Sequence, residues 1–75
     1  MKTPSYYIGK YFRIQAIDVV HDFELNYNLG VSVSYLLRAG KKTEDPREDI
    51  QKAIAHLNLE LNRLDLLEND KDLRK

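Results

Sequence analysis

The chain is short, electrically neutral and free of cysteine. Its 75 residues carry 12 Lys and Arg against 12 Asp and Glu, and 43% of them are hydrophobic. This composition excludes disulfides and cysteine-based zinc or redox sites, and the missing basic excess argues against a general nucleic-acid binder. A core built from so few residues rarely supplies more than about 3–5 kcal/mol, so we expect one domain over residues 1–75 that gains stability as a homo-oligomer.

No stretch suggests a membrane span or a targeting segment. Residues 1–7 lack the apolar run of a signal peptide, and nowhere do about 20 apolar residues follow one another. We therefore expect a cytoplasmic protein without a membrane partner.

The charge is unevenly distributed along the chain. Residues 1–43 carry six bases against three acids, and residues 44–75 carry nine acids against six bases. These complementary halves suit packing within the chain or contact between subunits.

The N-terminal region, residues 1–14, is predicted to form an extended or short β arm. Pro4 and Gly9 disfavour a helix there, and aromatic side chains favour a strand pair or an arm packed through its rings: Tyr6, Tyr7, Tyr11 and Phe12. A short helix should follow over residues 15–23, where residues of one face recur at helical spacing: Ile14, Ile17 and either Val20 or His21.

The second predicted helix, residues 27–38, has a clear start and end. Asn26 can accept a backbone N–H of the first turn, and Gly40 stands where a left-handed residue follows a helix. The apolar stripe of this helix consists of Leu29, Val33, Leu36 and Leu37. Gly30 inside the helix costs up to about 1 kcal/mol relative to alanine, so we expect that either a close helix crossing or a ligand needs its missing side chain.

The third predicted helix is the longest and runs from Pro46 to Glu68. Asp45 supplies a capping side chain, Pro46 suits the first helical position, and Glu48 stands three residues after the cap. Apolar residues then repeat every three or four positions: Ile50, Ala53, Ile54, Leu57, Leu61, Leu64 and Leu67. We expect this stripe to pack within the domain and residues 69–75 to form a frayed tail.

A second row of leucines on the same helix repeats every seven residues and falls on a different face: Leu59, Leu66 and Leu73. One small domain has difficulty covering two faces of one helix, so we expect Leu59 and Leu66 to form an interface between copies of the chain. The alternative is that they are scattered surface leucines. The predicted fold is mainly α, with three helices (short, medium and long) forming a core over residues 15–68 behind the extended or short β N-terminal arm.

The polar candidates for a binding site lie around the end of the second helix. Tyr35 and Arg38 are neighbours one turn apart, and Lys41 and Lys42 follow the glycine that ends the helix. An aromatic ring beside a guanidinium and two lysines can stack a base and hold a phosphate. Cations at a helix C-terminus also serve simply to complement its dipole.

Other chemistry-bearing residues give weaker signals. The acids of residues 44–49 either bind Mg²⁺ or cap the third helix, and Asp49 is the one that capping does not need. Lys52, three residues later, can lie beside Asp49. The glycines are isolated, which excludes a phosphate-binding loop, and His21 and His56 have no metal-ligand spacing. We expect both histidines to be packing residues.

Two motifs resemble the small SaV-like family of tailed-phage proteins, whose pattern reads G-N-A-I-K-Y-I-x-R-A-G-K-K followed by D-L-x-K-A. The corresponding segments here are Y-L-L-R-A-G-K-K at residues 35–42 and D-I-Q-K-A at residues 49–53. The segment P-S-Y-Y at residues 4–7 is similar to the family's P-x-H-Y opening, and I-D-V-V at residues 17–20 to its I-D-V-I segment. The resemblance covers residues 4–64, nearly the whole chain.

The same domain forms the C-terminal part of a phage nucleotide kinase that phosphorylates deoxynucleoside monophosphates without a Walker motif. The resemblance therefore implies nucleotide binding and phosphoryl transfer in an oligomeric assembly. Carried over to the matching positions, it implies nucleotide and phosphate contacts for Tyr35, Arg38, Lys41, Lys42 and Lys52, and a role towards Mg²⁺ or Lys52 for Asp49. An N-terminal tyrosine, Tyr6 or Tyr7, is expected to contact the base or sugar.

Three positions depart from the family's pattern. Its histidine is Tyr6 here, its asparagine after the glycine is Val31, and its lysine before the tyrosine is Ser34. The last two changes remove an amide and a cation from one helix face, which weakens the expectation of catalysis.

Two hypotheses about function follow. One is a nucleotide-binding phage protein with nucleoside-monophosphate kinase activity based on electrostatic phosphate positioning. The other is a non-catalytic oligomeric module that acts on a host or phage protein. An all-helical pyrophosphatase fits less well, because it needs paired acids on facing helices and Glu60 stands almost alone.

Overall fold

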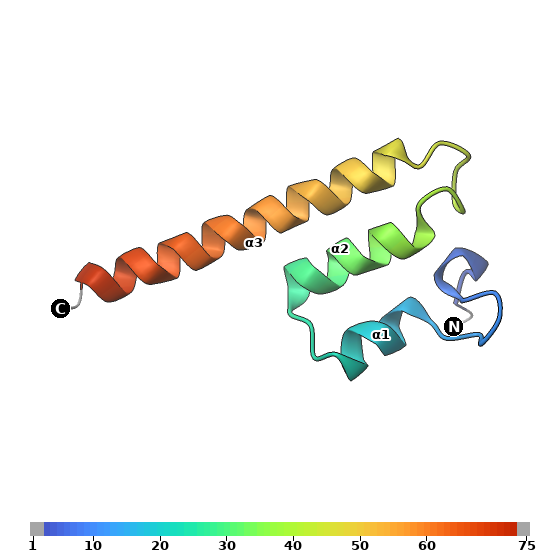
Figure 1. Cartoon of the computed structure of the whole chain (residues 1–75), viewed down its shortest axis with the longest axis horizontal. Coiled ribbons are helices and arrows are strands. Elements are labelled where there is room, and N and C mark those ends of the chain that lie inside the picture. Colours follow the sequence, from blue (N-terminus) through green and yellow to red (C-terminus); the bar gives the residue numbers. More distant parts are fainter. Residues whose placement is uncertain (1–2, 74–75) are drawn as a thin grey trace.

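The computed structural model describes residues 3–73, with the side chains of residues 3–69. A 3₁₀ turn, η1 (Ser5–Tyr7), precedes the three helices, which are α1 (Ala16–Asp22), α2 (Tyr27–Arg38) and α3 (Arg47–Leu73). The predicted, mainly α fold with a short, a medium and a long helix is thus confirmed. The three helices lie side by side, with α2 between α1 and α3 (Figure 1).

The N-terminal arm contains a tight turn where a strand pair was one expectation. The Tyr7 N–H donates to the Pro4 carbonyl and the Ile8 N–H to the Ser5 carbonyl, both at 3.0 Å. A single antiparallel bridge then joins Ile8 to Gln15, the residue before α1. Pro4 explains the turn, because its fixed φ suits the start of a short helical segment.

α1 packs closely on α2 at Gly30. Ala16 of α1 is only 4% exposed. A Cβ atom at Gly30 of α2 would come within 2.9 Å of Cγ1 of Val20. Of the two explanations for Gly30, the close helix crossing is therefore confirmed. The predicted apolar face of α1 is only partly right, because Ile14 and Ile17 remain about half exposed.

Both ends of α2 have the predicted caps. Asn26 Oδ1 accepts a hydrogen bond from the Leu29 N–H at 3.0 Å. Gly40 has a φ of 79°, the left-handed conformation that glycine adopts at low cost. The sequence also correctly placed the start of α3, where Asp45 Oδ1 accepts from the Arg47 N–H at 3.0 Å.

Two details of α3 differ from the prediction. Glu48, placed where a capping box would use it, instead forms an ion pair with Lys52 at 3.1 Å. The helix also continues past Glu68 to Leu73, so residues 69–73 of the predicted tail are helical. The remainder of that tail and the Leu73 side chain lie outside the described part of the chain.

Small and polar side chains make the contact between α2 and α3. On α3 they recur every three or four residues: Asp49, Ala53, His56 and Glu60. On α2 their partners are Asn28, Ser32, Tyr35 and Arg38. In the middle of this contact, Ser32 Oγ lies 3.3 Å from the Ala53 carbonyl oxygen, and both residues are 1% exposed. We call these two rows the polar seam.

The apolar stripe of α3 is consequently not buried as predicted. Only Ala53 of that stripe is covered, and the other six side chains are 39–59% exposed: Ile50, Ile54, Leu57, Leu61, Leu64 and Leu67. The reason is that the matched polar residues of the seam turn the stripe away from α2. Among the apolar side chains of residues 3–69, only Ala16 and Ala53 are almost fully buried.

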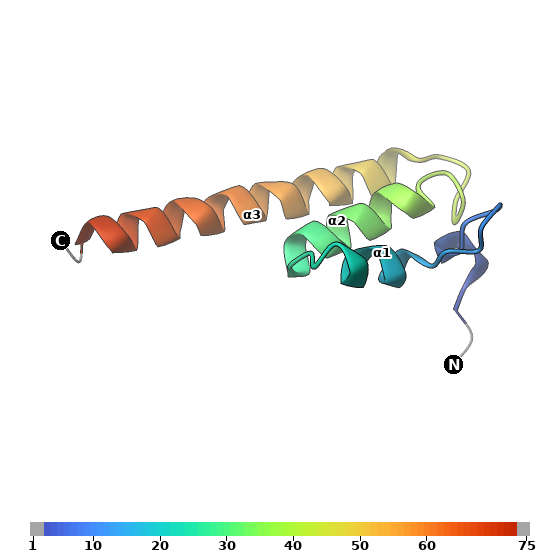
Figure 2. The same ribbon diagram turned by 60° about the horizontal axis from the view of Figure 1, so that its bottom comes forward.

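The arrangement leaves much of the helical surface open. α1 and α3 pack on opposite sides of α2, and the C-terminal part of α3 projects well beyond the start of α2 (Figures 1 and 2). The molecule is correspondingly elongated, with principal dimensions of 51 × 26 × 21 Å. Leu59 and Leu66, the residues predicted to contact another copy, are 53% and 68% exposed.

Candidate functional site

An almost buried ion pair joins the end of α2 to the start of α3. Arg38 is 7% exposed, its Nε donates to Asp49 Oδ1 at 3.1 Å, and its Nη2 lies 3.0 Å from the same oxygen. Its Nη1 donates to the Tyr7 hydroxyl oxygen at 2.9 Å. One guanidinium thus connects α2, α3 and the N-terminal arm, and it joins the basic first half of the chain to the acidic second half.

The surroundings of Arg38 favour its charged form. Burial alone would lower the pKa of the guanidinium, but the hydrogen bond to Asp49 and the interactions with Tyr7 outweigh it. The pKa of Arg38 is therefore raised above its already high ordinary value. Direct phosphate binding by Arg38 was predicted, whereas in the structure its guanidinium is engaged by Asp49 and Tyr7.

Three tyrosine rings surround the same guanidinium. The Arg38 Cζ lies 4.6 Å from the ring centroid of Tyr35, 5.8 Å from that of Tyr7 and 5.9 Å from that of Tyr6. The Tyr6 and Tyr7 rings meet edge to face at 4.7 Å. A cation within about 6 Å of an aromatic centroid is attracted by the ring, so Arg38 holds these rings in place.

Two of the three predicted lysines join this group. Lys42 Nζ lies 5.8 Å from the Tyr6 centroid, and Lys52 Nζ lies 5.5 Å from the Tyr35 centroid. Lys52 forms its ion pair with Glu48, whereas the spacing had indicated that it can lie beside Asp49. Lys41 instead donates to the Leu37 carbonyl at 2.7 Å, which stabilises the C-terminal end of α2. The cation–tyrosine cluster therefore consists of Tyr6, Tyr7, Tyr35, Arg38, Lys42 and Lys52.

A pocket of about 340 Å³ adjoins this cluster between α1, α2 and the arm. Its walls include three tyrosines, Tyr7, Tyr27 and Tyr35, together with apolar side chains of α1 and α2. Val31 and Ser34, two of the positions at which the chain departs from the phage family's pattern, also line it. We call this space the tyrosine pocket.

His56 supports the tyrosine pocket from the α3 side. Its ring stacks on Tyr35 with centroids 6.0 Å apart and meets Tyr27 edge to face at 6.1 Å. Its Nδ1 lies 3.3 Å from Asn28 Oδ1. The expectation that His56 is a packing residue is confirmed. Its support of the pocket depends on the register of α2 against α3, which no local sequence pattern reports.

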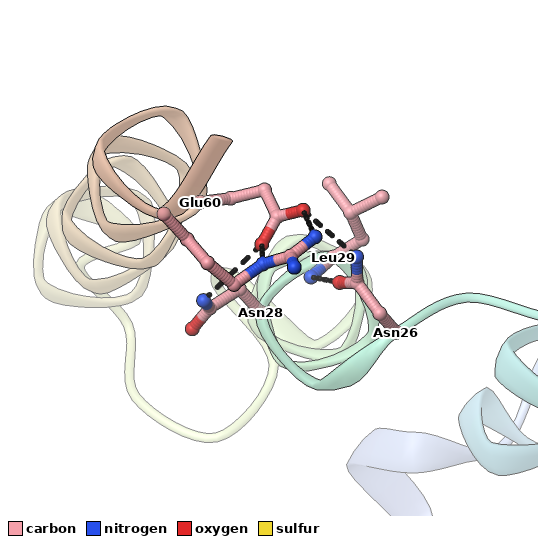
Figure 3. A network of polar contacts seen from close by, with 5 residues as sticks. Asn26, Asn28, Leu29 and Glu60 are labelled. Atoms are coloured by element: carbon pink, nitrogen blue, oxygen red, sulfur yellow. Dashed lines mark hydrogen bonds and ion pairs between the residues drawn. The ribbon is translucent and has the colours of Figure 1, made fainter. Parts of the chain in front are cut away.

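A second polar cluster lies at the other end of the seam (Figure 3). Glu60 is 6% exposed and accepts hydrogen bonds from Asn26 Nδ2 at 2.8 Å and from Asn28 Nδ2 at 3.4 Å. Arg63 donates to both of its carboxylate oxygens, at 2.9 and 2.8 Å. These hydrogen bonds, the one from Arg63 above all, lower the pKa of Glu60 to about 2. This cluster was not predicted from the sequence, although the three-residue spacing of Glu60 and Arg63 is a recognisable helical ion-pair signal.

The structure gives Asp49 a protein partner in the position where Mg²⁺ was expected. Its Oδ1 is shared by two nitrogens of Arg38. Within the described part of the chain, no three His, Asp or Glu side chains are grouped so that they could hold a metal ion. Asp49 is thus the partner that positions Arg38, and its role towards Mg²⁺ stays a prediction.

Comparisons with protein families, curated proteins and solved structures found no match to this chain. The resemblance to the SaV-like phage family stays a prediction that rests on the motifs alone. Among the helices of residues 3–73, none combines the length and the apolar composition that crossing a membrane requires.

Proposed function

We propose that this protein binds a nucleotide, with the base in the tyrosine pocket and the phosphate near Lys42 and Lys52. One observation carries the proposal. A pocket with three tyrosines in its walls adjoins a cluster of three cations, and two of those tyrosines are held by the central cation, Arg38. Resemblance to a nucleotide-kinase domain supports the same assignment independently of the geometry.

The size and chemistry of the pocket suit a nucleoside. Small-molecule sites are usually about 300–1,000 Å³, mostly apolar and lined by a few polar groups. Stacking of a base on an aromatic side chain contributes about 1–3 kcal/mol and tolerates any base. Tyr27 and Tyr35 offer such rings, and the hydroxyl of Ser34 lies in the same wall.

The cations divide into two roles under this proposal. Arg38 is a positioning residue, because its guanidinium is buried and holds Tyr7 and Tyr35. Lys42 and Lys52 supply the charge for a phosphate, since each extends over a tyrosine of the cluster. Lys52 is half exposed in its pair with Glu48, so a phosphate can replace that carboxylate at small cost.

Phosphoryl transfer to a nucleoside monophosphate is the second part of the proposal. Such transfer needs positioning and charge neutralisation rather than a covalent nucleophile. Val31 and Ser34 in the pocket wall stand in place of the family's asparagine and lysine, so the wall offers fewer groups that could hold a second phosphate. Any Mg²⁺ would arrive bound to the nucleotide.

Calorimetric titration with a panel of nucleoside mono- and triphosphates tests binding. We expect heat with at least one of them, and a roughly tenfold weaker affinity after Lys52→Ala or Lys42→Ala, as for loss of one charge-assisted contact. Lys10→Ala is the matched control, because Lys10 also lies over a tyrosine, Tyr11, at 5.4 Å, but outside the cluster. No heat with any nucleotide at millimolar concentration would refute the proposal.

Turnover is measured separately by following ADP release from ATP and Mg²⁺ with each nucleoside monophosphate. Product that disappears in Lys52→Ala but not in Lys10→Ala supports phosphoryl transfer. Binding without product restricts the proposal to a nucleotide-binding protein.

A second candidate function is a non-catalytic module that binds a host or phage protein. The observation that favours it is the exposed row of Leu59 and Leu66 on the projecting helix α3. Affinity capture from infected and uninfected host lysate should then recover a protein that Leu59→Asp with Leu66→Asp no longer binds. Capture that is unchanged in this double variant would exclude the leucine row as the binding surface.

A further inference from the structure

An uncovered apolar face lies on one side of the pair formed by α2 and α3. Each of its α3 residues directly follows a residue of the polar seam, as Ile54 follows Ala53, and the same holds on α2, where Val33 follows Ser32. One residue along a helix is a rotation of about 100°, and in antiparallel helices equal rotations lead to the same side. The apolar face therefore combines Leu29, Val33 and Leu36 of α2 with Ile50, Ile54, Leu57 and Leu61 of α3.

This face carries no charge along its length. The charged residues of α3 between Ile50 and Leu64 are Lys52, Glu60 and Arg63, and all three have an ion-pair partner within the chain. The α3 residues that directly follow those of the face are all neutral: Gln51, Ala55, Asn58 and Asn62. Half-exposed leucine and isoleucine side chains at spacings of four, three and four residues are the pattern by which helices pack on one another.

We propose that the apolar face packs against the same face of a second copy of this chain, with the two α3 helices antiparallel. The spacing of the face is self-complementary. Ile54 and Leu57 are equally far from the midpoint between residues 55 and 56, and so are Ile50 and Leu61. A two-fold axis at this midpoint places Ile54 opposite Leu57 of the other copy and Ile50 opposite Leu61, as an isologous interface requires.

The charged residues at the two ends of the apolar face also fit a two-fold axis at this position. Arg47 lies one turn before Ile50, and Asp65 lies one turn after Leu61. The antiparallel arrangement brings Arg47 of one copy close to Asp65 of the other at both ends of the interface. Within one chain, Arg47 has only an exposed partner, Asp45 at 3.5 Å, and none of the ion pairs among the described residues includes Asp65. A parallel arrangement would instead place each of these charges beside the identical charge of the other copy.

The need for a second copy follows from the packing of the single chain. Stable domains usually consist of two or more layers that bury a shared core. Here α1 and α3 flank α2 in one layer (Figure 1), and only two apolar side chains in the described part of the chain are almost fully buried. Two such layers, face to face, give the packing of a helical bundle with the apolar face as its core.

Light scattering coupled to gel filtration tests the interface. We expect the unmodified protein to have twice the mass of the 8.8 kDa chain. The Ile54→Asp variant should have the mass of a single chain or lose its helical signal. Leu59→Asp is the matched control, because Leu59 is 53% exposed against 52% for Ile54 but lies on the opposite side of α3. This variant should stay dimeric. A monomeric unmodified protein, or dissociation by Leu59→Asp but not by Ile54→Asp, would overturn the proposal.

Reversal of the end charges tests the orientation without disturbing the packing of the chain. Arg47→Glu or Asp65→Arg alone should weaken dimerisation about tenfold at low salt, and the two together should restore it. The absence of cysteine permits a second measurement. Arg47→Cys and Asp65→Cys, carried on separate chains and mixed, should form a mixed disulfide in preference to either symmetric one. Preferential symmetric disulfides, or no restoration in the double reversal, would exclude the antiparallel arrangement.

Discussion

Arg38 is the residue at which the arm, α2 and α3 meet. Its guanidinium contacts Asp49 and Tyr7 through hydrogen bonds and Tyr35 through its face. An almost buried charge with this many partners is costly to leave unpaired, because both ions lost their water on folding. Its contribution is therefore best measured by removing one partner and then both.

Asp49→Asn should destabilise the protein by about 3 kcal/mol, because it leaves the buried guanidinium without its counter-charge. Arg38→Met combined with Asp49→Leu should recover most of that loss, since a well-packed apolar pair carries no desolvation cost. Urea denaturation followed by circular dichroism measures both. If the double variant is no more stable than Asp49→Asn, the ion pair contributes more than its desolvation costs, contrary to this expectation.

Part of this residue-scale arrangement could be predicted from the sequence. The pairing of Tyr35 with Arg38 follows from their spacing on one helix, and the cap at Asn26 follows from its side chain. The contact of Arg38 with Asp49 depends on the register of two helices. No periodicity indicates that register, so Mg²⁺ or Lys52 was the expected partner of Asp49, and Arg38 was not.

Glu60 makes the stability of the protein depend on pH. Its pKa is about 2 in the folded chain against an ordinary value of 4.5, so the folded state binds its proton less tightly than the unfolded state. The stabilisation is complete above the ordinary value and is lost as the pH falls towards 2. Thermal unfolding between pH 7 and pH 2 should show this loss in the unmodified protein.

The matched variant for this titration is Glu60→Gln, which keeps the size of the side chain. It should be less stable than the unmodified protein at pH 7, and the difference should shrink as the pH approaches 2. Glu68→Gln is the control, because this exposed acid takes part in none of the ion pairs among the described residues. An equal pH dependence in both variants would contradict the assignment to Glu60.

At the scale of the elements, the contact of α1 with α2 depends on one missing side chain. Gly30→Ala gains up to about 1 kcal/mol of helix propensity, but its methyl group meets the stiff Val20 at 2.9 Å. Overpacking of this kind costs about 1–3 kcal/mol, so we expect a net loss of about 1 kcal/mol. Val20→Ala removes the clash, so the double variant should lose less than the two single losses combined. Strict additivity in urea denaturation would show that Gly30 serves another purpose.

The helices themselves could be predicted, and the faces they bury could not. Caps at Asn26 and Asp45 and the left-handed Gly40 place the helix ends within a few residues, apart from the C-terminal end of α3. Hydrophobic periodicity identifies an apolar stripe on α3 but not the element that covers it. Here the close approach of Ser32 and Ala53 and the polar pairs at both ends of the seam determine the contact with α2.

At the scale of the whole molecule, the two proposed surfaces lie on opposite sides of one layer of helices. Val31 lines the tyrosine pocket and Val33 belongs to the apolar face. Two residues along a helix are about 200° apart, so α2 presents these surfaces in opposite directions. A dimer formed through the apolar face therefore leaves both tyrosine pockets open, and each chain of the folded dimer should bind one nucleotide.

Folding coupled to dimerisation should make the stability of this protein depend on its concentration. Each tenfold dilution removes about 1.4 kcal/mol from the stability of a dimer, which lowers the Tm by about 3–6 °C for two chains of this length. Ile54→Asp should abolish this dependence, because it places a charge in the centre of the apolar face, whereas Leu59→Asp should retain it. Melting curves followed by circular dichroism over a hundredfold range of concentration give the answer directly. A Tm that does not change over this range would mean that one layer of helices, with its apolar face open to water, is stable alone.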